Sequence, residues 1–130
     1  VPVHCTSSGK VLLAYLPEAR RQAVLREAPL TALTPHTITS RAQLSAELER
    51  VRRRGWSEAV NEREIGIASI AAPIRDISGE VVAAISIGVP LARCNVMALR
   101  RLAPVIMEAA EAASRRLGWS GEVRPREAEV

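Results

Sequence analysis

The stretch IASIAAPIRDISGEVVAAISIGV, residues 67–89, decides the fold. It holds two apolar runs, residues 67–74 and 81–89, on either side of the turn-forming sequence DISGE, residues 76–80. Two such runs around a turn are typical of a β-hairpin, and Gly79 is placed for a positive φ. Both runs are apolar at odd and even positions, so both faces of the hairpin must be covered, by helices or by a ligand.

Three helices are predicted before the hairpin. Hydroxyl residues at the start of segment 6–16 can cap a first helix, and Pro17 fits the first turn of a second. The clearest helix covers residues 41–54, with Ser40 or Thr39 as its cap and Gly55 as its stop. Its predicted buried stripe is Leu44, Leu48 and Val51.

A short strand in residues 56–60 precedes the hairpin, and a long helix follows it up to Gly118, kinked or started at Pro104. The inward residues expected on this last helix are Leu99, Leu102, Ile106, Ala109 or Ala110, Ala113 and Leu117. Strands joined by a hairpin, with helices outside them, predict an α/β (α+β) fold with an antiparallel sheet flanked by helices. No glycine-rich nucleotide loop is present, which agrees with this class.

Length and composition fit one domain with a real core, since 48% of the 130 residues are hydrophobic. No apolar run approaches the length of a membrane span, so no membrane partner is expected. Two distant cysteines do not form a disulfide framework, which favours a reduced, cytoplasmic setting. The formal charge of +4 is almost all arginine. Its densest run, residues 52–54, ends a predicted helix and offsets the helix dipole, and no DNA-reading motif accompanies it.

Catalytic and metal sites are disfavoured. Cys5 beside His4 resembles a thiol with its base, but adjacent residues on an extended segment point to opposite sides. The carboxylates of Glu58, Glu62 and Glu64, or His36, could orient that pair only through an accident of folding. His4, Cys5, His36 and Cys94 lack paired metal-ligand spacing. No enzyme activity, cofactor or metal is therefore expected, and both cysteines are interpreted as small buried filler.

A small polar pocket is favoured instead. If Thr6 or Ser7 caps the first helix, the amides of residues 8–10 point out of its N-terminus, where a carboxylate is favoured. Ser69 and Ser86 interrupt the apolar strands and would lie opposite one another in a tight hairpin across residues 77–78. A bulge at Gly79 would shift that register by one residue. Gly88 shares the face of Ser86 and leaves space there.

These segments resemble the effector-binding domain of IclR-type bacterial transcriptional regulators. The resemblance covers residues 1–118 and depends on four motifs. They are T-x-x-G-K-x-L-L-A at residues 6–14, T-P-H-T-I-T at 34–39, R-x-x-G-W at 52–56 and E-x-x-x-G-I-x-x-I-A-A-P-I at 62–74. The resemblance implies a GAF-like fold and a pocket for a small metabolite, often a carboxylate. It implies no catalysis.

The resemblance also implies which residues bind the effector. They are Ser7, Ser8, Gly9, Leu13, Ala59, Ile67, Ser69, Ser86 and Gly88. Ala59 stands where the family can place an acidic residue, so a less hydrophilic effector is expected. The amino-acid sequences of segments 4–10 and 60–66 most resemble the branch of the family that senses aromatic acids such as 4-hydroxybenzoate or protocatechuate.

The family assembles as dimers or tetramers and binds DNA through a winged helix-turn-helix domain that precedes this one. That domain, its linker and the first strand or strands of the effector domain are expected upstream, and residues 119–130 are expected to form a tail. Two rival interpretations stay open: a stand-alone GAF-like module for another ligand, such as a nucleotide, and a hydrolase that uses Cys5.

Overall fold

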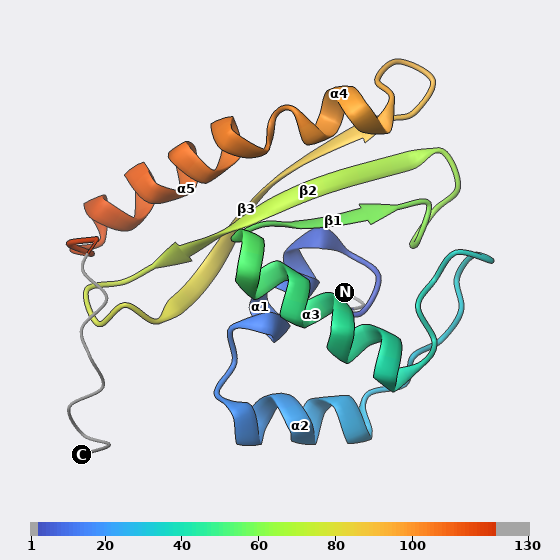
Figure 1. Cartoon of the computed structure of the whole chain (residues 1–130), viewed down its shortest axis with the longest axis horizontal. Coiled ribbons are helices and arrows are strands. Elements are labelled where there is room, and N and C mark those ends of the chain that lie inside the picture. The colour runs from blue at the N-terminus through green and yellow to red at the C-terminus, as the bar shows by residue number, and fades with distance from the viewer. Residues whose placement is uncertain (1–2, 122–130) are drawn as a thin grey trace.

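The computed structural model describes residues 3–121 (Figure 1). Helices and strands follow in the predicted order, except that the last helix is divided in two. The elements are α1 (Ser7–Ala14), α2 (Glu18–Glu27), α3 (Arg41–Arg54), β1 (Ser57–Val60), β2 (Ile67–Arg75), β3 (Val81–Pro90), α4 (Val96–Arg100) and α5 (Ala103–Arg116).

Within the described residues the strands form one antiparallel sheet of order β1-β2-β3. Helix α1 packs on one face of the sheet, α3 packs against α1, and α2 lies outside them against α3. Helices α4 and α5 cover the other face (Figure 1). This mixed α+β arrangement of an antiparallel sheet between helices confirms the predicted fold class.

Capping residues set the helix boundaries as the sequence predicts. The Thr6 side chain accepts a hydrogen bond from the Gly9 amide and begins α1. Ser40 accepts from the Gln43 amide and begins α3, which Gly55 ends in the left-handed conformation with φ 85°. These bonds satisfy amides and carbonyls that a helix leaves free at its ends.

The two faces of β2 belong to two separate cores, because successive side chains of a strand alternate. Ala71 faces the core beneath α1 and α3, whose buried members include the predicted stripe of α3. Ala68, Ile70 and Ala72 face the core beneath α4 and α5. The prediction that both faces of the hairpin are covered is therefore confirmed for β2.

The hairpin register differs from the prediction. Ser69 pairs with Gly88, and Ser86 pairs with Ala71, so the two serines are not opposite one another. The Asp76 amide donates a hydrogen bond to the Glu80 carbonyl, which closes a turn longer than the predicted one. A bulge also lies between Ile74 and Arg75. The shift is two residues, which preserves the face that each side chain occupies.

The inward face of the last helix also differs from the prediction. Leu99, Ile106 and Ala110 are buried as expected, whereas Leu102 and Leu117 are 36% and 50% exposed. Ala103 and Ser114 take the inward places. The chain turns between α4 and α5, with Pro104 in the first turn of α5, and this break changes the face presented to the sheet.

The helical periodicity of the sequence does not explain why Ser114 is buried. Its hydroxyl accepts a hydrogen bond from the Arg75 amide at 2.8 Å and donates to the Ala110 carbonyl at 2.7 Å. The bulge at Arg75 interrupts the strand ladder, and Ser114 supplies the partner that the ladder does not.

Most of the predicted tail, residues 122–130, lies outside the described residues. Between residues 3 and 121 no helix is long and apolar enough to cross a membrane.

Candidate functional site

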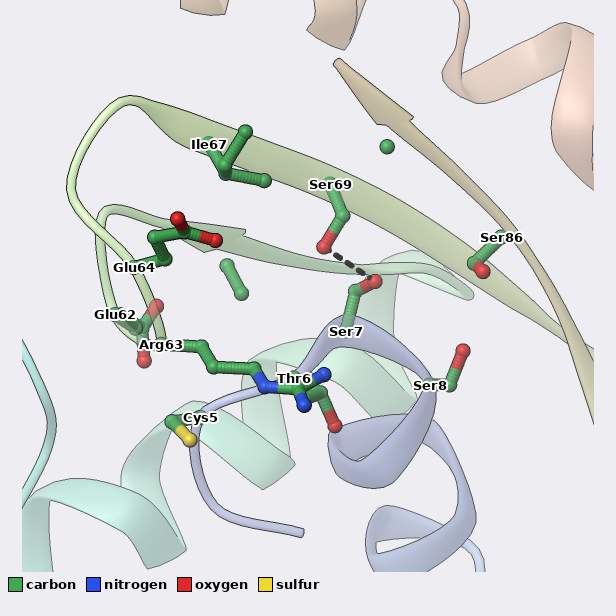
Figure 2. Close-up of a pocket in the computed structure, with 12 residues that line it drawn as sticks. Cys5, Thr6, Ser7, Ser8, Glu62, Arg63, Glu64, Ile67, Ser69 and Ser86 are labelled. Atoms are coloured by element: carbon green, nitrogen blue, oxygen red, sulfur yellow. Dashed lines mark hydrogen bonds between the residues drawn. The ribbon is translucent and has the colours of Figure 1, made fainter. Parts of the chain in front are cut away.

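A pocket of about 600 Å³ lies on the α1 face of the sheet, between the start of α1, the strands and the loop of residues 61–66 (Figure 2). Its volume falls in the range typical of small-molecule sites. The lining residues are Cys5, Thr6, Ser7, Ser8, Ala59, Glu62, Arg63, Glu64, Ile67, Ser69, Ser86 and Gly88.

The floor of the pocket is made of small residues from all three strands. Ala59, Ser69 and Gly88 are paired across β1, β2 and β3, so they form one row on one face. A Cβ added to Gly88 would meet nothing within 4 Å. This row therefore leaves a flat, open floor with one hydroxyl at its centre.

Ser7 joins the start of α1 to this floor. Its hydroxyl donates to the Ser69 hydroxyl at 2.7 Å, and its carbonyl accepts from the buried Ser57 hydroxyl at 2.5 Å (Figure 2). By contrast, no hydrogen bond among the described residues uses the hydroxyl of Ser8 or Ser86. Since both also line the pocket, their hydroxyls are available to a bound molecule.

A largely buried ion pair borders the pocket through Glu62. Lys10, the only lysine of the chain, is 1% exposed, and its Nζ donates to Glu62 Oε2 at 2.8 Å and to the Glu58 carbonyl at 2.9 Å. The second oxygen of Glu62 is buried and has no hydrogen-bond partner among the described residues. Lys10 thus holds the charged loop against the start of β1 and neutralises one of its carboxylates.

The backbone of the 61–66 loop is fixed by two threonines from a distant segment. Thr34 Oγ1 donates to the Asn61 carbonyl and Thr37 Oγ1 donates to the Glu62 carbonyl, both at 2.5 Å. Asn61 has a positive φ of 57°, and its side-chain oxygen accepts the Gly66 amide at 2.7 Å. These bonds give the loop one defined path along the edge of the pocket.

Cys5 is fully buried at the base of the pocket. Desolvation raises the pKa of its thiol, and the Glu62 charge raises it further, while Arg63 and Lys10 act in the opposite direction. The thiol is therefore held in its neutral, weakly nucleophilic form, which disfavours the hydrolase interpretation. No hydrogen bond among the described residues joins His4 to this thiol, and His4 Nε2 lies 2.8 Å from the Thr31 carbonyl. Among residues 3–121 no His, Cys, Asp and Glu side chains gather into a possible metal site.

The structure brings most of the predicted effector-binding residues together. Those that line the pocket are Ser7, Ser8, Ala59, Ile67, Ser69, Ser86 and Gly88. Leu13 instead lies in the core beneath α1, 3% exposed. Gly9 faces the preceding chain, because an added Cβ would lie 2.6 Å from the Val3 Cα and from Thr6 Oγ1. The amides of Gly9 and Lys10 are occupied by Thr6, so they do not point into the pocket as expected.

Sequence reasoning did not assign the charged loop residues Glu62, Arg63 and Glu64 to the pocket. One signal was available, since a short charged connection between two antiparallel strands must lie at the end of the sheet where both strands meet it. That end also carries Gly88 and the beginning of β2.

Comparisons with known proteins define the class. Residues 1–115 match the family model described as bacterial transcriptional regulator IclR C-terminal. The "Probable transcriptional regulator SauR" of Cupriavidus necator is 40% identical over 111 residues, which cover 85% of this chain and 44% of the relative. The chain therefore belongs to the IclR family of bacterial transcriptional regulators and corresponds to their C-terminal effector-binding domain. It spans less than half the length of that relative.

Solved structures of regulators share the fold of this chain. The crystal structure of the Thermotoga maritima IclR has a TM-score of 0.84 and 37% identity, over 90% of this chain and 47% of that one. The inducer-binding domain of a double mutant of the Acinetobacter PobR transcription factor, solved as its 3-hydroxybenzoic acid complex, has a TM-score of 0.83. It is 29% identical, over 88% of this chain and 66% of the other.

Proposed function

We propose that this domain binds a small organic acid, of the aromatic carboxylate class, in the pocket between α1 and the sheet. The observation that carries the proposal is the convergence of Ser7, Ser8, Ser69 and Ser86 on one hollow beside a helix N-terminus. Hydroxyl donors and the positive end of the α1 dipole favour a carboxylate without a metal or a cofactor.

An aromatic ring suits the rest of the hollow. The row of Ala59, Ser69 and Gly88 is flat because its side chains are small, and Ile67 adds an apolar wall. The 3-hydroxybenzoic acid complex of the PobR domain supports the same ligand class. A nucleotide suits the hollow less well. Among the described residues that line it, only Arg63 is positively charged and none is aromatic, so a polyphosphate and a base would each lack partners.

Binding of the acid would control DNA binding because the two are coupled through the arrangement of the subunits. We propose that the domain, spanning residues 1–118 with its first strands upstream, assembles as a homodimer or homotetramer in the cytoplasm. The acid would favour one arrangement of subunits and so change the spacing of upstream winged helix-turn-helix domains that contact DNA. Such control requires unequal affinity of the acid for the two arrangements.

The test is a thermal shift of the purified protein with a panel of small acids that includes benzoate and its hydroxy derivatives. A ligand that binds only the folded state raises the melting temperature. We expect at least one aromatic acid to do so and Ser86→Leu to abolish the rise, because leucine fills the hollow. Ser45→Leu, the same change on the exposed face of α3, should leave the rise intact. No rise with any acid would contradict the proposal.

A further inference from the structure

Arg63 is the only positively charged residue that lines the pocket in the described part of the chain. We infer that its guanidinium selects a negatively charged group on the effector, holding it against the first turn of α1, and that Glu64 opposes this selection. The inference rests on the proposed function and adds to it the residue that recognises charge.

The charge of Arg63 is unpaired within residues 3–121. No ion pair among the described residues includes Arg63 or Glu64, whereas Lys10 and Glu62 neutralise each other. In Figure 2 the Arg63 side chain extends from the loop across the hollow toward Thr6 and Ser7. Its charge also acts on the base of the pocket, where it partly opposes the rise in the pKa of Cys5 that burial and Glu62 cause.

Three features that favour an anion therefore meet at one place. The first turn of α1 contributes the positive end of the helix dipole. The hydroxyl of Ser8 is unbonded among the described residues and can donate to an oxygen. The guanidinium supplies paired N–H groups that match the geometry of a carboxylate.

Glu64 sets the strength of this selection. It lies next to Arg63, lines the same hollow and is exposed. With both residues present, the carboxylate of Glu64 weakens the attraction of the guanidinium for an acid. Without the charge of Arg63, the carboxylate of Glu64 is left alone there and repels an acid. Without the charge of Glu64, the guanidinium acts unopposed.

No hydrogen bond or ion pair among the described residues involves the side chain of Arg63 or Glu64. The loop path is fixed by Thr34, Thr37 and the side chain of Asn61, all of which bond to backbone groups. Substitutions at residues 63 and 64 therefore change the charge at the pocket while leaving the loop in place.

The experiment compares acids with their uncharged amides, benzoate with benzamide and 4-hydroxybenzoate with 4-hydroxybenzamide, by calorimetric titration of the purified protein. We expect Arg63→Gln to weaken acid binding by about tenfold, the loss that follows from removing one hydrogen bond to a charged group. Glu64→Gln should strengthen acid binding by about two- to threefold. Neither change should alter amide binding.

Salt dependence separates a charge effect from a structural one. Raising the ionic strength should weaken acid binding by the original protein more than by Arg63→Gln, because exposed charges are screened. Arg116→Gln, an exposed arginine at the end of α5 on the other face of the sheet, is the matched control and should leave acid binding unchanged.

The outcomes are distinguishable from a failure of the proposed function. If an acid binds the original protein and Arg63→Gln binds it equally well, or loses acid and amide alike, the role of Arg63 is wrong while the pocket stands. If no acid binds the original protein, the proposed function and this inference are both wrong.

Discussion

The hydroxyl of Ser7 on α1 donates to the hydroxyl of Ser69 on β2 at 2.7 Å. This bond crosses 62 residues of sequence and fixes the helix start over the floor of the pocket. Ser7 is only 2% exposed, so water can replace this partner only poorly.

Ser69→Ala should therefore lower the free energy of unfolding by about 1 kcal/mol. The double variant Ser7→Ala with Ser69→Ala should lose little more than Ser69→Ala alone, because the two residues share one bond. Chemical denaturation of the four proteins measures this coupling. Fully additive losses would show that the bond does not contribute to stability.

Lys10→Met should be strongly destabilising, because it leaves the carboxylate of Glu62 without its partner. Side chains at this ion pair are 1% and 12% exposed, and removing one member of a buried pair costs about 3–5 kcal/mol. Glu62→Gln in the same background should recover part of the loss by removing the uncompensated charge. Denaturant unfolding checks both changes. A loss of less than about 1 kcal/mol, typical of a surface pair, would contradict this account.

The pair of Glu58 and Arg100 should make stability depend on pH. Burial raises the pKa of Glu58, but the two hydrogen bonds and the charge of Arg100 outweigh it, with help from Arg54 and Lys10, so the net pKa is lowered from 4.5. A lowered folded-state pKa gives stability that is complete above the unfolded value and is lost as pH falls through the folded value.

Glu58→Gln should accordingly cost about 1 kcal/mol at pH 7, a small value because Arg100 is 46% exposed. The difference between the two proteins should shrink as the pH falls below about 4.5. Thermal melts across pH 3–7 measure it. A difference that does not change with pH would assign the loss to packing.

Gly9→Ala should destabilise the protein by about 1–3 kcal/mol, the usual cost of overpacking. The added Cβ would lie 2.6 Å from the Val3 Cα and 2.7 Å from the Val3 carbonyl oxygen, and backbone atoms cannot give way cheaply. Gly88→Ala is the control, since nothing lies within 4 Å of its Cβ position. Equal stability of the two variants would show that residues 3–6 do not pack on α1 as described.

Cys5 should react with iodoacetamide at pH 8 at least about tenfold more slowly than Cys94, because only the thiolate attacks and burial raises the pKa of Cys5. Cys5 is fully buried, whereas Cys94 is half-buried. Mass spectrometry of the two cysteine-containing peptides gives both rates. Equal labelling would mean that the base of the pocket opens freely.

Local sequence signals were sufficient for most of the fold. The caps at Thr6 and Ser40, the left-handed stop at Gly55 and the stripe of α3 each depend on residues within a few positions of one another. The hairpin register was not predictable in this way. It depends on a five-residue turn and a bulge whose freed amide is bonded by Ser114, a residue 39 positions away.

The candidate site was predictable where it consists of strand residues, because alternation fixes the face on which Ala59, Ser69, Ser86 and Gly88 lie. It was not predictable where it depends on the loop. The path of residues 61–66 is fixed by Thr34 and Thr37, which no local pattern connects to it. Gly9 was predicted to bind the effector. Its lack of a side chain instead allows Val3 and Thr6 to pack closely against the start of α1.

The anchoring of Asn61 and Glu62 by two threonine hydroxyls has a consequence for how such a domain diversifies. The two threonines hold the loop through main-chain carbonyls, which every amino acid has. The loop path therefore does not depend on which side chains occupy the neighbouring positions 63 and 64. On the proposed role of Arg63 and Glu64, exchange of those two side chains would change the chemical preference of the pocket in one or two mutational steps, with no compensating change elsewhere.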